Sequence, residues 1–180
     1  MHQHLATKLS MAVAVVVLVT LTSCSGQTTP ETSPTSSQET EMIDPAQART
    51  DLYAQLDAAQ ALVGGEWDNS DDSSPMGCTL NSTEGVTFTG TRYSNDTAGE
   101  ESLAAVAQLW EGMGFTTEAR NDVGPYKVIV ATSTTDPSHV LRYGLAEQAM
   151  YLEGQGACGE GDLYEWVMKI RQESEDATQE

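Results

Sequence analysis

The chain has 180 residues, of which 8 are Lys or Arg and 27 are Asp or Glu, so its formal net charge is −19. Proteins that bind nucleic acid draw much of their affinity from Lys and Arg that neutralise phosphates, so this composition excludes that class. Its acidity also repels an anionic lipid surface, and we therefore expect the folded domain to stand away from a membrane.

Residues 1–23 have the layout of an export signal. Lys8 is the one firm charge, and an apolar stretch follows at residues 11–19 with no acidic residue before Cys24. A membrane-spanning helix needs about 20 apolar residues. This stretch is about half as long, which is typical of the core of a secretory signal.

The segment Leu21-Thr22-Ser23-Cys24 resembles the lipobox of bacterial lipoproteins, in which an aliphatic residue and two small residues precede the lipidated cysteine. It predicts cleavage between Ser23 and Cys24 and a diacylglyceryl group on Cys24. Such a protein stays on the extracytoplasmic face of the bacterial cell membrane, since two acyl chains anchor durably. The alternative is an ordinary secretory signal with a chance cysteine at its cleavage site. Removal of the signal removes Lys8 and no acidic residue, so the mature chain has 7 basic and 27 acidic residues and a formal net charge of 7 − 27 = −20.

The mature chain divides into three parts by composition. Residues 24–43 begin with the lipidated cysteine and continue as a Ser, Thr and Pro-rich tract that is too polar to fold, so they form a tether. Residues 44–172 are the length of one domain. Residues 173–180 are acidic and lack large apolar side chains, which favours a disordered tail.

Two amphipathic helices are expected in the first half of the domain. Asp44-Pro45 opens a helix well, apolar residues then recur at spacings of three and four, and Gly64-Gly65 ends the pattern. Residues 97–100 match a capping box before a second apolar stripe, which ends at Gly112 and Gly114.

The strand signals fall between and after these helices, at residues 85–94, 115–120 and 126–132. Residues 140–158 fit both an alternating strand and a helix, and we favour strand because a turn at Asp136-Pro137 precedes them. A last short helix is expected after Asp162. The sum is an α+β fold, with an antiparallel sheet of about four strands and two to three helices packed on one face.

Once Cys24 carries lipid, Cys78 and Cys158 are the two cysteines that remain. An exported chain is free to oxidise them, so we predict one disulfide. The alternative is a pair of free thiols.

These features together resemble the LppA-type lipoproteins of mycobacteria and related actinobacteria. The likeness covers roughly residues 46–166. It rests on the lipobox, on the helix before Gly65-Glu66-Trp67, on Cys78 after an acidic loop, on the Gly114-Phe115 strand, and on the ending with Leu152, Gly156 and Cys158. It implies the α+β domain and the bridge between Cys78 and Cys158, but no reaction. The loop between Trp67 and Cys78 is shorter than in that family, so no property of the loop transfers.

No pattern in the sequence predicts catalysis, a metal or a cofactor. The mature chain has one histidine, His139, which we interpret as a solvated turn residue, and no nucleophile-elbow motif is present. Residues 68–72 are rich in the oxygen ligands that calcium prefers, but they lack the glycine and glutamate of an EF-hand. We therefore expect a solvated acidic loop and a protein that is not an enzyme.

Aromatic residues on or near the expected strands are the one indication of a binding surface: Trp67, Tyr93, Tyr126, Tyr143 and Tyr151. The favoured function is a non-enzymatic module of the cell envelope that binds another protein or the cell wall. The alternative is an extracytoplasmic carrier or receptor for a small or lipid-like ligand, which a closed apolar pocket would favour. More often, aromatic residues at such positions belong to the core, and this alternative applies to all five.

Overall fold

The computed structural model describes residues 42–71 and 74–178. The expected cleavage site at Ser23, the lipidation site at Cys24 and all but the last two residues of the tether lie outside the described residues.

The domain is α+β, as expected, with one six-stranded antiparallel sheet and a separate two-stranded ribbon. The three helices are α1 (Pro45–Val63), α2 (Glu101–Gly112) and α3 (Leu163–Ala177). The strands are β1 (Asp68–Ser70), β2 (Met76–Leu80), β3 (Thr83–Thr87), β4 (Thr89–Ser94), β5 (Phe115–Val123), β6 (Tyr126–Ser133), β7 (Val140–Leu145) and β8 (Met150–Gln155). The large sheet has the order β1-β4-β8-β7-β6-β5, and β2 pairs with β3. The strand count exceeds the four expected.

The first helix begins and ends where the sequence indicated. The side chain of Asp44 accepts hydrogen bonds from the backbone N–H groups of Ala46 and Gln47, and Pro45 occupies the first turn. At the other end Gly64 adopts φ 76°, a conformation that glycine reaches without the steric cost of a Cβ.

The predicted capping box of α2 is wrong. The residue before the helix is Glu100, and its side chain makes no capping bond. The hydroxyl of Thr97 instead donates to the carbonyl oxygen of Ala146, on the loop after β7. A tertiary contact has therefore taken the side chain that the local pattern assigned to the helix.

Residues 85–94, expected as one strand, form parts of two strands in different sheets. β3 pairs with β2, and β4 pairs with β8, with Phe88 fully buried at the break. The carbonyl of Phe88 accepts a hydrogen bond from the N–H of Gly156, which ties the break to the end of β8. β1 and β2 were not anticipated. Residues 140–158 are extended as favoured, and contain the β7–β8 hairpin.

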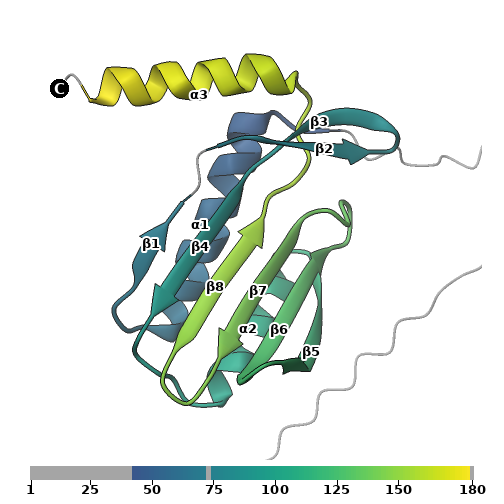
Figure 1. Ribbon diagram of the computed structural model, residues 1–180. Helices are drawn as coiled ribbons and strands as arrows, with labels where there is room; N and C mark the ends of the chain where they lie inside the picture. The colour runs from purple at the N-terminus through teal and green to yellow at the C-terminus, as the bar shows by residue number, and fades with distance from the viewer. Residues whose placement is uncertain (1–41, 72–73, 179–180) are drawn as a thin grey trace, which may run out of the picture. The chain divides into compact units, whose positions relative to one another are not determined.

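Helices α1 and α2 pack on one face of the large sheet, and we call this its covered face (Figure 1). Alternate residues of the strands point into this layer. In β7 and β8 these residues are Leu141, Tyr143, Leu145, Met150 and Leu152, all buried in the core with Leu52, Leu56, Val106 and Trp110 of the helices. The opposite face, which we call the open face, carries the intervening residues.

The predicted disulfide between Cys78 and Cys158 is confirmed, with a Cα–Cα distance of 5.8 Å. It joins the β2–β3 ribbon to the segment after β8. The buried carboxylate of Asp136 strengthens this junction, because one oxygen accepts from the N–H of Cys158 at 2.7 Å and the other from Ser138. The turn before β7, the ribbon and the end of β8 are thus held together.

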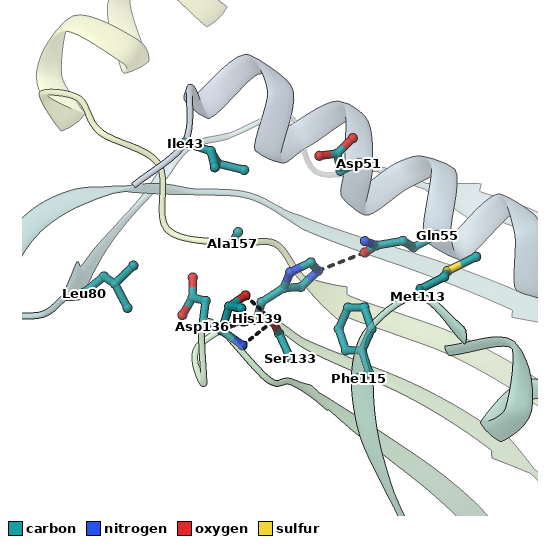
Figure 2. A pocket seen from close by; sticks show the side chains of 11 residues that line it. Ile43, Asp51, Gln55, Leu80, Met113, Phe115, Ser133, Asp136, His139 and Ala157 are labelled. Carbon is teal, nitrogen blue, oxygen red and sulfur yellow. Dashed lines mark hydrogen bonds between the residues drawn. The ribbon is translucent and has the colours of Figure 1, made fainter. Parts of the chain in front are cut away.

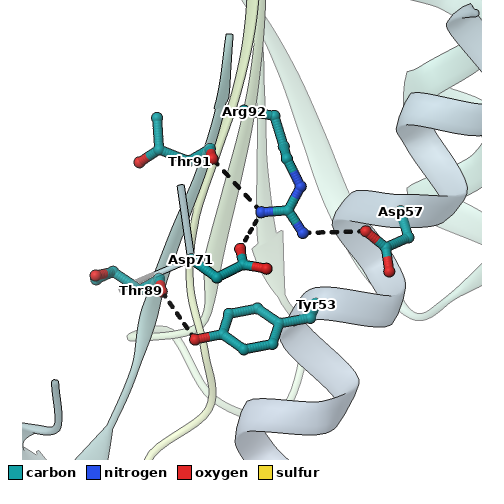
Figure 3. A network of polar contacts seen from close by, with 6 residues as sticks. All are labelled: Tyr53, Asp57, Asp71, Thr89, Thr91 and Arg92. Atoms are coloured by element: carbon teal, nitrogen blue, oxygen red, sulfur yellow. Dashed lines mark hydrogen bonds and ion pairs between the residues drawn. The ribbon is translucent and has the colours of Figure 1, made fainter. Parts of the chain in front are cut away.

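A buried charged residue, Arg92 of β4, lies on the covered face and is 1% exposed. Its guanidinium reaches Asp57 of α1 at 3.0 Å and Asp71, which follows β1 (Figure 3). Burial lowers the pKa of Arg92, but the bonds and charges of these two carboxylates outweigh it and leave the pKa above its ordinary value. The arginine therefore links β1 and α1 to the centre of the sheet.

The last helix lies beside the ribbon rather than in the helical layer behind the sheet (Figure 1). Asp162 caps it by accepting from the N–H of Glu165, as expected, and Trp166 packs edge-on against Phe88 at 5.9 Å. The helix continues to Ala177, through residues that composition had placed in the disordered tail. Within the described part of the chain, no helix meets the length and apolarity that a bilayer crossing requires.

Candidate functional site

Three of the five predicted aromatic residues gather on the open face of the sheet. Tyr93 of β4 and Tyr151 of β8 are direct cross-strand partners. Their ring centres are 6.3 Å apart, and the ring of Tyr126, at the start of β6, meets that of Tyr151 edge-on at 5.1 Å. We call these three residues the tyrosine cluster. Tyr93 is 57% exposed, so the cluster is open to a partner.

A glycine makes room for the middle tyrosine. Gly144 of β7 pairs with Tyr151, and a Cβ at this position would collide with the tyrosine ring. A glycine inside a strand often marks a place where another group approaches closely. Here the Tyr151 ring lies across the neighbouring strand, which brings it to Tyr126 two strands away in the sheet order.

The open face has a low net charge although the chain is strongly acidic. The strand register places Arg142 opposite Glu153, with 3.9 Å between their charged atoms, places Glu118 and Arg120 on the same face of β5, and sets Asp68 of β1 opposite Tyr93. Between these charges the register sets uncharged residues, namely Thr89, Thr91, Thr116, Thr132, Val128, Val130, Val140 and Gln155. The face therefore has two positive and three negative charges among apolar and hydroxyl-bearing side chains.

A shallow hollow of about 620 Å³ adjoins the tyrosine cluster. Tyr126 and Pro125 line one side, and residues 146–149 of the β7–β8 turn line the other. The cluster is thus continuous with a concave surface at the tips of two hairpins.

Tyr151, the middle residue of the cluster, has a shifted pKa. Burial raises the pKa of Tyr151, and the nearby charge of Glu153 raises it further. Tyr151 is therefore protonated at neutral pH, when its hydroxyl can donate and accept hydrogen bonds while the ring supplies apolar contact. These are properties of a binding surface.

The other two aromatic residues, Tyr143 and Trp67, do not belong to the open face, so their prediction as part of a binding surface is wrong. Tyr143 is fully buried on the covered face, where its hydroxyl lies 2.9 Å from that of Ser102 in α2. Burial raises the pKa of Tyr143, and the Ser102 hydrogen bond partly opposes this. Trp67 is half-buried against the core, and its indole N–H donates to the carbonyl of Gly64. The alternation Leu141, Tyr143, Leu145 was the sequence signal that placed Tyr143 with the core.

His139 is not a solvated turn residue, because it is 7% exposed. Its ring packs edge-on against Phe115 at 4.8 Å, and one ring nitrogen lies 2.9 Å from the side-chain oxygen of Gln55 (Figure 2). Burial lowers the pKa of His139, although the charges of Asp136 and Asp51 oppose this. A neutral, packed histidine that is bonded to an amide has a structural role.

The cavity beside His139 measures about 230 Å³ and is lined by both polar and apolar side chains (Figure 2). It lies between α1 and the ends of β5 and β6, with Asp51 and Phe115 on opposite sides. Ligand pockets for drug-sized molecules are usually 300 to 1,000 Å³. This cavity is therefore small for a carrier site.

The acidic segment that begins at residue 68 pairs with the rest of the domain and is not a solvated loop. Residues 68–70 form β1 on the edge of the sheet, and Asp71 pairs with Arg92. Asp72 lies outside the described residues. Among the residues that the structure describes, no group of three or more His, Cys, Asp or Glu is placed to hold a metal ion.

Comparison with known proteins yields one likeness of fold. No family model matches the sequence, and no curated protein matches it. A crystal structure of a DUF4853 family protein from Actinomyces odontolyticus is similar, with a TM-score of 0.50 over 68% of this chain and 71% of that one. The two sequences are 12% identical, so the similarity concerns the fold alone.

Proposed function

We propose that this protein is a lipid-anchored, non-enzymatic module of the bacterial cell envelope that binds a protein partner on the open face of its sheet. The observation that carries the binding role is the tyrosine cluster on a face of low net charge. The anchor is inferred from the lipobox at Cys24. Both inferences fit an LppA-type lipoprotein.

The composition of the open face favours a protein partner. The centres of protein interfaces are enriched in Tyr and Arg, and this face carries the tyrosine cluster with Arg120 and Arg142. Five strands about 4.8 Å apart and six residues long cover roughly 500 Å². An interface of this size is small, which suits a transient contact.

The position of the cluster also suits an anchored receptor. Tyr151 lies near the start of β8, whereas the end of β8 leads to Gly159, which bridges to Ile43 beside the tether. The tyrosine cluster therefore lies toward the end of the sheet that is remote from Ile43, where the described domain begins.

A carrier for a small or lipid-like ligand is the second candidate. The hollow beside Tyr126 is the feature that favours it, because its volume lies in the range of ligand sites. It ranks second because the hollow is open and shallow, whereas carriers usually bury most of the ligand.

Photo-cross-linking in the producing cell tests the binding role. A photoreactive amino acid at Glu153, beside the tyrosine cluster, is compared with one at Ala61, an exposed residue of α1. We expect a discrete protein adduct from position 153 and none from position 61. Equal labelling from both positions, or labelling of lipid or glycan in place of protein, would contradict a protein partner on this face.

The anchor is tested separately. Intact mass measurement of the mature protein should show a diacylglyceryl group on Cys24, and Cys24→Ser should release the protein from the membrane fraction. A mature chain without acyl mass would refute the anchor while leaving the open face as a binding surface.

A further inference from the structure

The first two turns of α3 expose a row of large apolar side chains. Tyr164 is 71% exposed, and Leu163, Val167 and Met168 are between 36% and 42% exposed. At about 100° per residue these four positions fall within an arc of about 140°. Glu165 lies outside this arc, and Arg171 lies within it. We call these four residues the apolar side of α3.

The opposite part of the helix already has its packing partners. Trp166 packs against Phe88, and Ile170 is buried. The apolar side is therefore additional to the surface that attaches α3 to the domain. A contiguous apolar surface of this kind marks an interaction site.

The N-terminal segment of the chain itself has no residues suited to cover this surface. Residues 25–41 contain only Ser, Thr, Gly, Pro, Gln and Glu. The occupant must then come from outside the mature chain.

The location of α3 identifies that occupant. The segment before α3 is bonded to the start of the domain, because the N–H of Glu160 donates to the carbonyl of Ile43 at 2.8 Å. Leu163 lies near β2, whose first residue, Met76, is also exposed. The helix thus starts where the tether enters. Cys24 is 42 − 24 = 18 residues from Met42. Since a fully extended chain spans at most about 3.6 Å per residue, Met42 can lie no more than about 65 Å from a lipid attached to Cys24.

We propose that the apolar side of α3 docks on the lipid bilayer that carries the anchor. This inference rests on the proposed anchoring at Cys24. Helices that lie in a membrane interface have an apolar face flanked by Lys or Arg, and Arg171 lies on the apolar side of α3 one turn after Val167. A tether of this length keeps the bilayer at a high effective concentration, so a weak contact is sufficient.

The docking revises the expectation, drawn from net charge alone, that the whole domain stands away from the membrane. The apolar side lies at the anchor end, whereas the tyrosine cluster lies toward the other end of the sheet. Contact through α3 would therefore orient the domain and leave the open face accessible.

The test supplies the anchor chemically, so that it does not depend on lipidation by the cell. The mature chain, residues 24–180, is coupled through the thiol of Cys24 to a maleimide lipid in phosphatidylcholine nanodiscs, since Cys78 and Cys158 are paired. Spin-labelled lipid then broadens the methyl NMR signals of residues near the bilayer. We expect at least fivefold more broadening at Leu163 and Val167 than at Leu62, an exposed leucine of α1.

Two variants complete the test. Val167→Glu combined with Met168→Glu should reduce the broadening at Leu163 to the level at Leu62, while Leu62→Glu should leave it unchanged. Equal broadening at Leu163 and Leu62 in the unmodified chain would overturn the proposal. So would a dimer in analytical ultracentrifugation that forms without lipid and is abolished by the double variant, since a second copy would then cover α3.

Discussion

The two faces of the six-stranded sheet differ in what their residues do, although they are built from alternate residues of the same strands. The covered face carries Leu141, Tyr143 and Leu152 against the helices, and its side chains are buried. The open face carries the tyrosine cluster and a mixed set of charges. Two adjacent residues of one strand can therefore be assigned separately, one to stability and the other to the proposed binding.

The largest expected contrast lies between neighbouring residues of β8. Leu152→Ala removes a fully buried side chain of the covered face and should lower the free energy of unfolding by about 2–5 kcal/mol. Glu153→Ala, on the open face, should change it by no more than about 0.5 kcal/mol. Denaturant titration of both variants measures the difference. Similar losses from the two would break the division between the faces.

Substitutions of Arg92 test how a buried charged residue contributes to the stability of the otherwise apolar covered face. Arg92→Ala should cost about 2–3 kcal/mol, because it removes a buried side chain and its links to Asp57 and Asp71. Arg92→Met should cost less, since its side chain refills much of the space and both carboxylates retain access to water. Urea midpoints at one pH rank the three proteins. An Arg92→Met variant as unstable as Arg92→Ala would show that the ion pairs outweigh the packing.

His139 gives the covered side of the molecule a pH dependence. Burial lowers its pKa in the folded state, so the unfolded chain binds the proton more readily. Stability is therefore full above the ordinary histidine pKa and falls as the pH drops below it, by at most about 1.4 kcal/mol per pH unit for one proton. Unfolding at pH 7.5 and 5.5 should differ less in His139→Gln than in the parent. An equal pH dependence in both would assign the effect to other groups.

The hydroxyl groups of two tyrosines provide a smaller contrast. Tyr143→Phe removes the hydrogen bond to Ser102 inside the helical layer and should cost about 1 kcal/mol. Tyr151→Phe removes a hydroxyl from the open face and should leave stability nearly unchanged. Thermal unfolding followed by circular dichroism compares them, and a larger loss for Tyr151→Phe would contradict the assignment.

The smallest effect on stability is expected at Gly144, where the effect on binding should be large. Gly144→Ala forces the Tyr151 ring away from its position across β7, and a half-exposed ring has space to swing outward. The melting temperature should therefore change little, while the cross-linked adduct from position 153 should fall several-fold. An unchanged adduct would separate Tyr151 from the binding role.

The sequence predicted the elements whose signals are local. Helix α1 begins at Asp44-Pro45 and ends at Gly64, as expected, and the alternation in residues 140–145 matched a strand. What it missed depends on distant partners. Thr97 bonds to Ala146 instead of capping α2. Residues 85–94 divide at Phe88, whose carbonyl bonds to the N–H of Gly156, while Val86 of β3 bonds to Gly159.

The candidate site was predicted in part for the same reason. Tyr93, Tyr126 and Tyr151 were named from their positions near strands, but only the register of β4, β8 and β6 brings them together. Tyr143 was named with them although it alternates with Leu141 and Leu145, which indicates the face of the core. The burial of His139 depends on Gln55 in α1, 84 residues away, and no local pattern reveals it.

Replacement of Tyr93 and Tyr151 by serine in a chain with the photoreactive residue at position 153 tests the central claim most directly. Adduct yield in the producing cell and the free energy of unfolding of the purified protein are measured on the same variant. The account predicts at least a fivefold loss of the adduct with a stability change below about 1 kcal/mol, because both residues lie on the open face. An adduct of undiminished yield in a folded variant would contradict it.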